Sequence, residues 1–177
     1  SEAHAIWSAV RSRRPLIFHL TNHVVMNEQA HVTLLIGASP LMSLHPAEAT
    51  ELANLADAVV VNIGTPTNEG IEAMHLAAQA AAESGKVLLL DPVGYGASAL
   101  RNGLVDSLLA HAQPTIIKGN HGELCVLGKA GGSVRGVDAD AAGNVVAAVQ
   151  GLANHHQALC VATGPVDYVS DGTNTTA

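Results

Sequence analysis

Short apolar runs of strand length recur along this chain and alternate with segments of helical periodicity. The clearest are residues 58–63 (AVVVNI), 87–90 (VLLL) and 159–163 (LCVAT). Runs that are apolar without alternation are typical of strands buried on both faces, as in a parallel sheet. Strands that alternate with helices predict βαβ units, whose right-handed crossovers place helices on both faces of the sheet. We therefore expect an α/β fold with a mostly parallel central sheet.

The other elements follow from the same periodicities and from the positions of glycine and proline. Gly37 and Gly85 suit the position after a helix end, and Pro46 suits the first turn of a helix. The glycine-rich stretch 128–136 (GKAGGSVRG) is expected to be a surface loop, because it follows a helix and does not match the phosphate-binding pattern GxxxxGK(S/T). The expected strands are residues 16–20, 40–44, 58–63, 87–90, 115–117, 159–163 and 166–170, and the expected helices are residues 24–36, 46–55, 71–84, 104–112, 122–127 and 139–155.

Length and charge restrict the class of protein. A chain of 177 residues is expected to form one domain. Its net charge of −7, with 8 Lys and Arg in total, leaves no basic surface for nucleic acid. No leader peptide and no membrane-spanning apolar run are visible, so we expect a cytoplasmic protein. Cys125 and Cys160 lack CxxC spacing and are expected to be buried, reduced thiols.

Polar residues cluster directly after the expected strands. In open α/β sheets, ligands bind outside the carboxyl ends of the strands. We therefore expect these segments to supply groups to a common ligand site. The segments are Thr21 with Asn22, Asn62 with Gly64 and Thr65, residues 91–94 (DPVG), residues 118–120 (KGN), and Thr163 with Gly164.

Two acidic residues in these segments are candidate ligands for Mg²⁺. Asp91 precedes a glycine-rich turn, where a carboxylate can hold the ion or orient a phosphate through its water shell. The alternative for Asp91 is a carboxylate that stabilises a turn before proline. Glu123 follows Asn120 at the spacing of a capping box, which is a purely structural alternative to metal binding. Lys118 is either a point charge for phosphates or a surface lysine.

The segment after the first strand is a candidate substrate site. The amide of Asn22 can both donate and accept hydrogen bonds, so it suits a small heteroaromatic ligand. Asn22 is equally suited to be the N-cap of the next helix, and the two roles are compatible. Met42 is apolar and adaptable, which suits either the core or contact with a flat ring.

The order of these motifs resembles a known family. The quoted segments are TNHVVMN at residues 21–27, GASPLM at 37–42, NIGT at 62–65, DPVG at 91–94, GN at 119–120 followed by Glu123, GVD at 136–138, TG at 163–164 and VDYV at 166–169. Together they are similar to hydroxyethylthiazole kinases, which are thiamine-salvage enzymes of the ribokinase-like superfamily. The resemblance covers nearly the whole chain, although each motif alone is weak.

The resemblance implies an activity and a set of site residues. Members of the family phosphorylate the primary alcohol of 4-methyl-5-(2-hydroxyethyl)thiazole with Mg-ATP and form trimers. By this resemblance, the thiazole is bound by Asn22, Val24 and Met42 with Gly64 and Thr65 nearby, Mg²⁺ is organised by Asp91 and Glu123, and ATP lies along Lys118, Asn120 and Thr163.

The sequence departs from the family pattern at three places. Lys118 stands where the family usually has arginine, and Pro165 stands where it usually has glutamate. The family also continues into a glycine-rich loop whose backbone N–H groups form the anion hole, beyond Ala177. We therefore assign no catalytic residue within residues 1–177, and we expect this part alone to be inert. Two alternatives remain: another ribokinase-like kinase of a vitamin alcohol or nucleotide hydrate, and a non-catalytic ligand-binding or oligomeric homologue.

Overall fold

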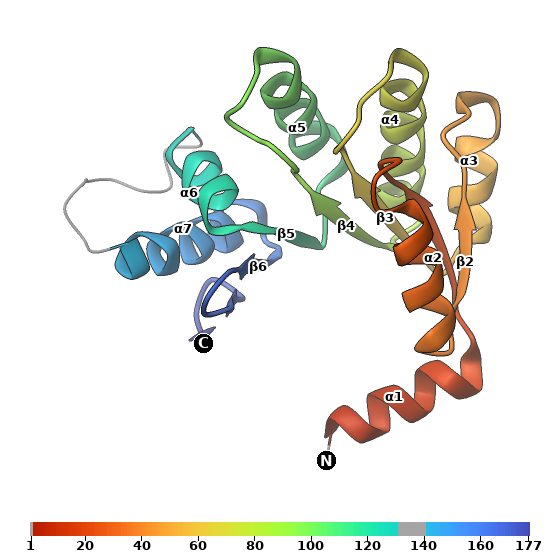
Figure 1. Cartoon of the computed structure of the whole chain (residues 1–177), viewed down its shortest axis with the longest axis horizontal. Helices are drawn as coiled ribbons and strands as arrows, with labels where there is room; N and C mark the ends of the chain where they lie inside the picture. The colour runs from red at the N-terminus through yellow and green to blue at the C-terminus, as the bar shows by residue number, and fades with distance from the viewer. Residues whose placement is uncertain (1, 131–140) are drawn as a thin grey trace. The chain divides into compact units, whose positions relative to one another are not determined.

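The computed structural model describes residues 2–130 and 141–177, and the chain divides into two compact units, Ser1–Leu88 and Leu89–Ala177 (Figure 1). Each unit contains parallel strands packed with helices, as the alternation of apolar runs and helical periods predicts. The region described contains no helix long and apolar enough to cross a membrane.

The first unit is built on three parallel strands. Its strand order is β2-β1-β3, and Phe18 of β1 lies opposite Leu41 of β2 and Val59 of β3. Helix α1 buries none of its residues, and Figure 1 shows it extending away from the strands of its unit. The elements are α1 (Glu2–Arg13), β1 (Leu16–Leu20), α2 (Met26–Leu35), β2 (Ser39–Met42), α3 (Pro46–Leu55), β3 (Ala58–Asn62) and α4 (Asn68–Glu83).

The core of the first unit is built from small side chains. Ala49 and Ala53 of α3 and Ala73 and Ala77 of α4 are fully buried, and the two helices pack against each other. Only 2% of the residues are aromatic, so close packing of helix backbones replaces the bulk that aromatic rings supply in other cores. Phe18 is the exception, fully buried on β1.

The second unit continues the parallel pattern and then reverses it. Strands β4, β5 and β6 are parallel neighbours, whereas β7 and β8 are added in antiparallel directions. Helices α6 and α7 pack against each other. The elements are β4 (Val87–Asp91), α5 (Ala99–Ala112), β5 (Ile116–Asn120), α6 (His121–Ala130), α7 (Ala141–His156), β6 (Leu159–Thr163), β7 (Tyr168–Ser170) and β8 (Thr175–Thr176).

The starts of α2, α4 and α5 differ from the sequence-based expectation for local reasons. Helix α4 begins at Asn68, since the Thr67 hydroxyl accepts a hydrogen bond from the Gly70 backbone N–H at 3.1 Å. Helix α5 begins at Ala99, since Ser98 caps it in the same way. Helix α2 is shorter than residues 24–36, because the residues before Met26 form a turn. Apolar periodicity does not register these polar first turns.

Other elements were missed or have different bounds. Helix α1 was not expected, because its apolar residues do not form a clear stripe along one face of the helix. Strand β5 runs on to Asn120, and β8 was not expected at all. The interpretation of residues 128–136 as a loop was wrong for Gly128, Lys129 and Ala130, which complete α6, and its remainder lies outside the described residues.

Candidate active site residues

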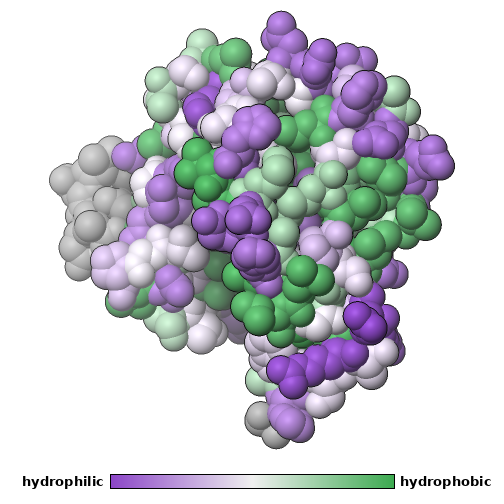
Figure 2. Space-filling model, turned by 45° about the vertical axis from the view of Figure 1, so that its right-hand side comes forward, coloured by the Kyte–Doolittle hydropathy of each residue, from purple (hydrophilic) through white to green (hydrophobic). Residues whose placement is uncertain are grey.

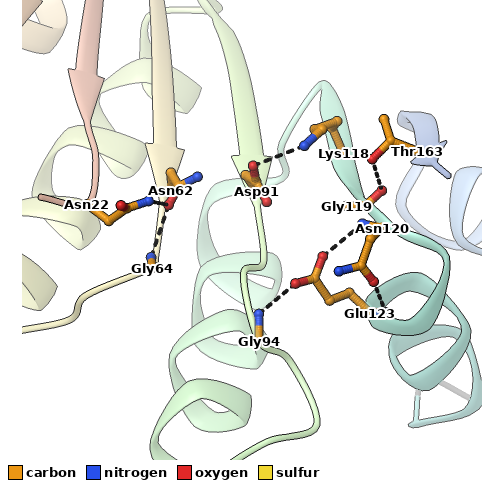
Figure 3. A network of polar contacts seen from close by, with 10 residues as sticks. All are labelled: Asn22, Asn62, Gly64, Asp91, Gly94, Lys118, Gly119, Asn120, Glu123 and Thr163. Carbon is orange, nitrogen blue, oxygen red and sulfur yellow. Dashed lines mark hydrogen bonds and ion pairs between the residues drawn. The ribbon is translucent and has the colours of Figure 1, made fainter. Parts of the chain in front are cut away.

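In the first unit, the turns after β1 and β3 are joined by buried asparagines (Figure 3). The Asn62 side-chain oxygen accepts a hydrogen bond from the Asn22 amide at 2.7 Å and another from the Gly64 backbone N–H at 3.0 Å. Asn22 is 6% exposed and Asn62 is 3% exposed. Two segments 40 residues apart in the sequence are therefore held together where their strands end.

The other end of the Asn22 amide shapes the turn before α2. Its oxygen accepts hydrogen bonds from the backbone N–H groups of Val24 and Val25, at 3.0 and 3.2 Å. The N-cap position itself is Val25, which makes no side-chain capping bond. The expectation that Asn22 is the N-cap was therefore wrong in position, although Asn22 does stabilise the turn that leads into the helix.

The three remaining residues predicted to bind the substrate lie in the same unit. Thr65 accepts a hydrogen bond from the His23 backbone N–H at 3.2 Å, which adds a second link between the two turns. Met42 ends β2 and is half-buried. Val24 is 74% exposed, so it is available for contact with a ligand or another chain.

Each unit has a pocket in its described residues. The pocket of the first unit, about 510 Å³, opens beside the ends of β1 and β2, but none of the five predicted substrate residues lines it. That of the second unit, about 540 Å³, lies along α5 and the end of α7 and is likewise away from the predicted residues. The first is lined by His23, Ser43, Leu44, His45, Thr67, Asn68 and Glu69, and the second by Tyr95, Asp106, Leu109, Ala110, Gln113, Leu127, His155, His156 and Gln157.

In the second unit, Asp91 and Lys118 form an ion pair between neighbouring strands. The Lys118 ammonium lies 3.4 Å from the Asp91 carboxylate, and their side chains are 38% and 14% exposed. Because β4 and β5 are parallel, residues near their carboxyl ends meet at the same edge. Lys118 therefore has a fixed electrostatic partner, which a simple surface lysine lacks.

Glu123 joins the β5–α6 turn to the turn after β4. One carboxylate oxygen accepts a hydrogen bond from the Asn120 N–H at 2.8 Å, while the Asn120 side chain accepts one from the Glu123 N–H at 2.9 Å. This reciprocal pair is the predicted capping box. The other oxygen of Glu123 accepts a hydrogen bond from the Gly94 N–H at 2.7 Å. Gly94 has φ +73°, a left-handed conformation that favours glycine.

A third contact brings β6 into the same network. The Thr163 hydroxyl donates to the Gly119 carbonyl at 3.3 Å, and Thr163 lies opposite Asn120 in the parallel register. Figure 3 shows Asp91, Lys118, Asn120, Glu123 and Thr163 gathered at the ends of β4, β5 and β6. The five residues predicted to bind nucleotide or metal are thus brought together within one unit.

The turn that contains Pro165 is closed by groups that sequence reasoning missed. The Asp167 carboxylate accepts a hydrogen bond from the Gly164 N–H at 3.0 Å, and a His121 ring nitrogen lies 2.8 Å from the Val166 carbonyl oxygen. A Cβ atom at Gly164 would lie 2.5 Å from the His121 ring. Asp167 lies within the VDYV segment that carries the family resemblance, and His121 lies between Asn120 and Glu123, but neither was proposed as a site residue.

The donor set in the second unit suits a hard cation. Carboxylate oxygens are the groups that Mg²⁺ prefers, and Mg²⁺ commonly binds proteins through one or two of them while keeping several waters. Asp91 and Glu123 are two such groups. No cluster of three or more His, Cys, Asp or Glu side chains suited to a metal occurs in residues 2–130 and 141–177. The arrangement therefore fits a metal held mainly by water and phosphate, and not a cage of protein ligands.

The two cysteines are free thiols. Burial raises the pKa of Cys160 to about 12 and also raises the pKa of the half-buried Cys125. Because the thiolate is the reactive form, neither environment favours a nucleophile. The expectation of buried thiols is confirmed for Cys160, whereas Cys125 is only partly covered.

Comparisons with known proteins identify the family. The chain matches the model of the hydroxyethylthiazole kinase family over residues 7–177. It is 43% identical over 163 residues to hydroxyethylthiazole kinase of Caldivirga maquilingensis, covering 92% of this chain and 61% of that protein. It is 44% identical over 164 residues to the enzyme of the same name from Desulforudis audaxviator, covering 92% of this chain and 60% of that protein.

Solved structures agree with this result. Hydroxyethylthiazole kinase from Pyrococcus horikoshii matches with a TM-score of 0.86 at 38% identity, over 97% of this chain and 64% of that chain. Adenosine kinase from Schistosoma mansoni matches with a TM-score of 0.57 at 12% identity, over 96% and 61% of the two chains. The second likeness concerns the fold alone, and together they confirm the expected ribokinase-like α/β class.

The chain spans about three fifths of the length of the curated relatives it matches, 61% and 60% for the two named above. The family model, by contrast, matches all of this chain except residues 1–6. This chain therefore belongs to the hydroxyethylthiazole kinase family.

Proposed function

We propose that the protein containing this chain is an ATP- and Mg²⁺-dependent kinase that phosphorylates the primary alcohol of 4-methyl-5-(2-hydroxyethyl)thiazole in thiamine biosynthesis or salvage. The observation that carries the proposal is the polar network of the second unit, in which Lys118 pairs with Asp91 and Glu123 holds the Gly94 N–H. Family membership supplies the substrate class.

The second unit supplies the groups for the nucleotide. Asp91 and Glu123 would hold the metal, directly or through its waters, and Lys118, Asn120 and Thr163 would lie along the phosphates. A bound Mg²⁺ would supply positive charge that offsets the negative charge of the phosphates during transfer. The Lys118 ammonium group, which pairs with Asp91, would contact the same phosphates. Glu123 keeps the 91–94 turn in place through Gly94, so its role is to orient as well as to bind.

The first unit supplies the groups for the thiazole. Val24 and Met42 would contact the ring, and Asn22, Gly64 and Thr65 would form the polar edge of the site. Both ends of the Asn22 amide already hydrogen-bond within the protein. We therefore assign to Asn22 the orientation of the turn that carries Val24, in addition to any contact with the ligand.

The proposed reaction is a direct transfer. The substrate hydroxyl oxygen forms a bond to the γ-phosphorus of ATP, the bond from that phosphorus to the bridging oxygen of ADP breaks, and the hydroxyl proton is released. No covalent enzyme intermediate is required, which agrees with the raised pKa values of both thiols. The residues of this chain bind and orient the reactants; the anion hole and the general base are assigned to no residue here.

Further parts of the proposal concern the whole protein. We place it in the cytoplasm and expect a homotrimer, in keeping with the family resemblance. Single-domain organisation also stays a prediction. In the described surface, several apolar side chains of the first unit are open to solvent, among them Val32, Leu34 and Leu35 at 56–77% exposure. Figure 2 shows such apolar groups gathered on the face turned to the viewer. An interface between subunits would cover them.

A substrate panel tests the activity. The full-length protein is incubated with Mg-ATP and, in separate reactions, the thiazole alcohol, other vitamin alcohols and a nucleotide hydrate. We expect kcat/KM for the thiazole to exceed the others by at least about 100-fold, a ratio that a pocket shaped to one substrate can supply. Turnover of another alcohol instead would support the alternative vitamin kinase. Thiazole binding without ADP release would support a non-catalytic homologue, for which Pro165 is the specific motivation.

A further inference from the structure

We propose that Asn62 is a positioning residue for the thiazole subsite, acting through Asn22. The proposal rests on the proposed function, because it deepens the role of the same subsite. Asn62 was not among the residues expected to bind substrate. Asn62 is the last residue of β3. Its side-chain oxygen accepts hydrogen bonds from two donors in different turns, the Asn22 side-chain amide and the Gly64 backbone N–H.

The geometry leaves the Asn22 side chain little freedom. Its nitrogen is fixed by Asn62 at 2.7 Å, and its oxygen is shared by the backbone N–H groups of Val24 and Val25. A planar amide with both ends engaged has one orientation. Hydrogen bonds between Asn62 and Asn22, and between Asn22 and the N–H groups of Val24 and Val25, therefore fix the position of the Val24–Val25 backbone relative to β3. Because Asn62 is 3% exposed, water cannot readily replace its oxygen as the acceptor.

Gly64 packs closely against the Asn22 side chain. A Cβ atom built there would lie 2.5 Å from the Asn22 side-chain nitrogen and 2.7 Å from its Cβ. No real Cβ atom occupies such a position without displacing its neighbour. Gly64 is not among the glycines with positive φ, so its requirement for glycine comes from this contact and not from the backbone conformation. Asn62 attracts the Asn22 amide while Gly64 leaves it space.

Loss of Asn62 is expected to act on the thiazole subsite through Asn22. Removing the Asn62 oxygen leaves the Asn22 amide held only at its oxygen end, by the backbone N–H groups of Val24 and Val25, which loosens the turn that carries Val24. Loss of Asn62 should therefore weaken thiazole binding, and the size of this effect should depend on the presence of Asn22.

The test is a double-mutant cycle in the full-length protein with Asn62→Ala, Asn22→Ala and the double variant. We expect Asn62→Ala to raise KM for the thiazole about 10-fold, the effect of about one lost buried hydrogen bond. In the Asn22→Ala background, the same substitution should change the thiazole KM by less than about 2-fold, since its effect is then already lost. Gly64→Ala should reproduce the Asn62→Ala result with the acceptor still present.

Controls separate this proposal from general destabilisation and from failure of the proposed function. Thr33→Val removes a buried hydrogen-bonding side chain of the same unit, 5% exposed, and should lower Tm without changing KM for either substrate. Equal effects of Asn62→Ala in the wild-type and Asn22→Ala backgrounds would overturn the positioning role. A wild-type protein that neither binds nor phosphorylates the thiazole would instead overturn the proposed function.

Discussion

At the scale of single residues, hydrogen bonding decides which polar groups have fixed orientations. Asn120 and Glu123 illustrate what sequence can predict: their spacing indicates a capping box, and the reciprocal bonds are present. The contact from Glu123 to Gly94 could not be predicted, because it joins two turns 29 residues apart in the sequence. The acceptor role of Asn62 is of the same kind. Local spacing predicts local caps, whereas contacts between strand ends require the register of the strands.

The buried histidine of β1 gives a prediction about pH. His19 is 7% exposed, one ring nitrogen lies 3.2 Å from the Thr33 hydroxyl, and the other has no hydrogen-bond partner in the described part of the chain. Burial lowers the pKa of His19 below its usual 6.5. Below that value the unfolded chain binds a proton that the folded chain does not, so folding loses stability as pH falls from about 6.5 through the folded pKa.

The variant His19→Leu cannot titrate, so we expect its free energy of unfolding to fall less than that of wild type between about pH 6.5 and 5. Urea unfolding at a series of pH values measures the difference. His31→Leu, an exposed position on α2, is the control and should retain the wild-type pH profile. Parallel profiles for wild type and His19→Leu would show that His19 does not contribute.

At the scale of elements, the apolar runs predicted the strands better than the periodicity predicted the helices. Strands β1 and β6 agree with their expected bounds, because consecutive apolar residues have no other place than the interior. Helix α5 begins before its first periodic apolar residues, after the N-cap Ser98, and the sequence does not distinguish this serine from a serine in a loop. The short β8 carries two threonines and depends entirely on pairing with β7. Strand β8, whose stability comes from its partner strand, was therefore missed by sequence alone.

The alanine-rich packing of α3 against α4 leads to a prediction about stability. Ala77 is fully buried on α4, and a larger side chain there would push α4 away from its neighbours. We expect Ala77→Leu to lower the free energy of unfolding by about 1–3 kcal/mol, the usual cost of overpacking. Glu72→Leu, at an exposed position of the same helix, should change it by less than about 0.5 kcal/mol. An equal effect of both substitutions in chemical denaturation would argue against tight packing at Ala77.

At the scale of the whole molecule, exposed apolar side chains point to association. Leu35 at the end of α2 is 77% exposed, more than the other exposed apolar side chains on that helix. We expect Leu35→Glu to weaken the proposed trimer, because a charge would then have to be buried in the interface. Light scattering after size-exclusion chromatography measures the mass. Thr50→Glu adds the same charge at an exposed position of α3 and should leave the mass unchanged. A wild-type monomer at micromolar concentration would contradict the proposal.

How far the sequence predicted the site also depends on scale. The motifs located the five nucleotide and metal candidates, and the structure gathers them because β4, β5 and β6 are parallel neighbours. The substrate candidates lie beside one another in the first unit for the same reason, since β1 pairs with both β2 and β3. Their chemical roles do not follow from placement alone: Asn22 has both ends of its amide engaged, and Glu123 is a structural link as much as a candidate ligand.

The central claim is that Asp91 and its partners serve phosphoryl transfer to a thiazole alcohol. The most direct measurement is mass spectrometry of the products formed from Mg-ATP and hydroxyethylthiazole by the full-length protein and by its Asp91→Asn variant in parallel. The account predicts the phosphorylated thiazole with the wild type, and a rate at least about 100-fold lower with Asp91→Asn, because the variant loses the charge that pairs with Lys118 and that is proposed to bind the metal. No phosphorylated thiazole from a folded wild type, or an undiminished rate for Asp91→Asn, would contradict it.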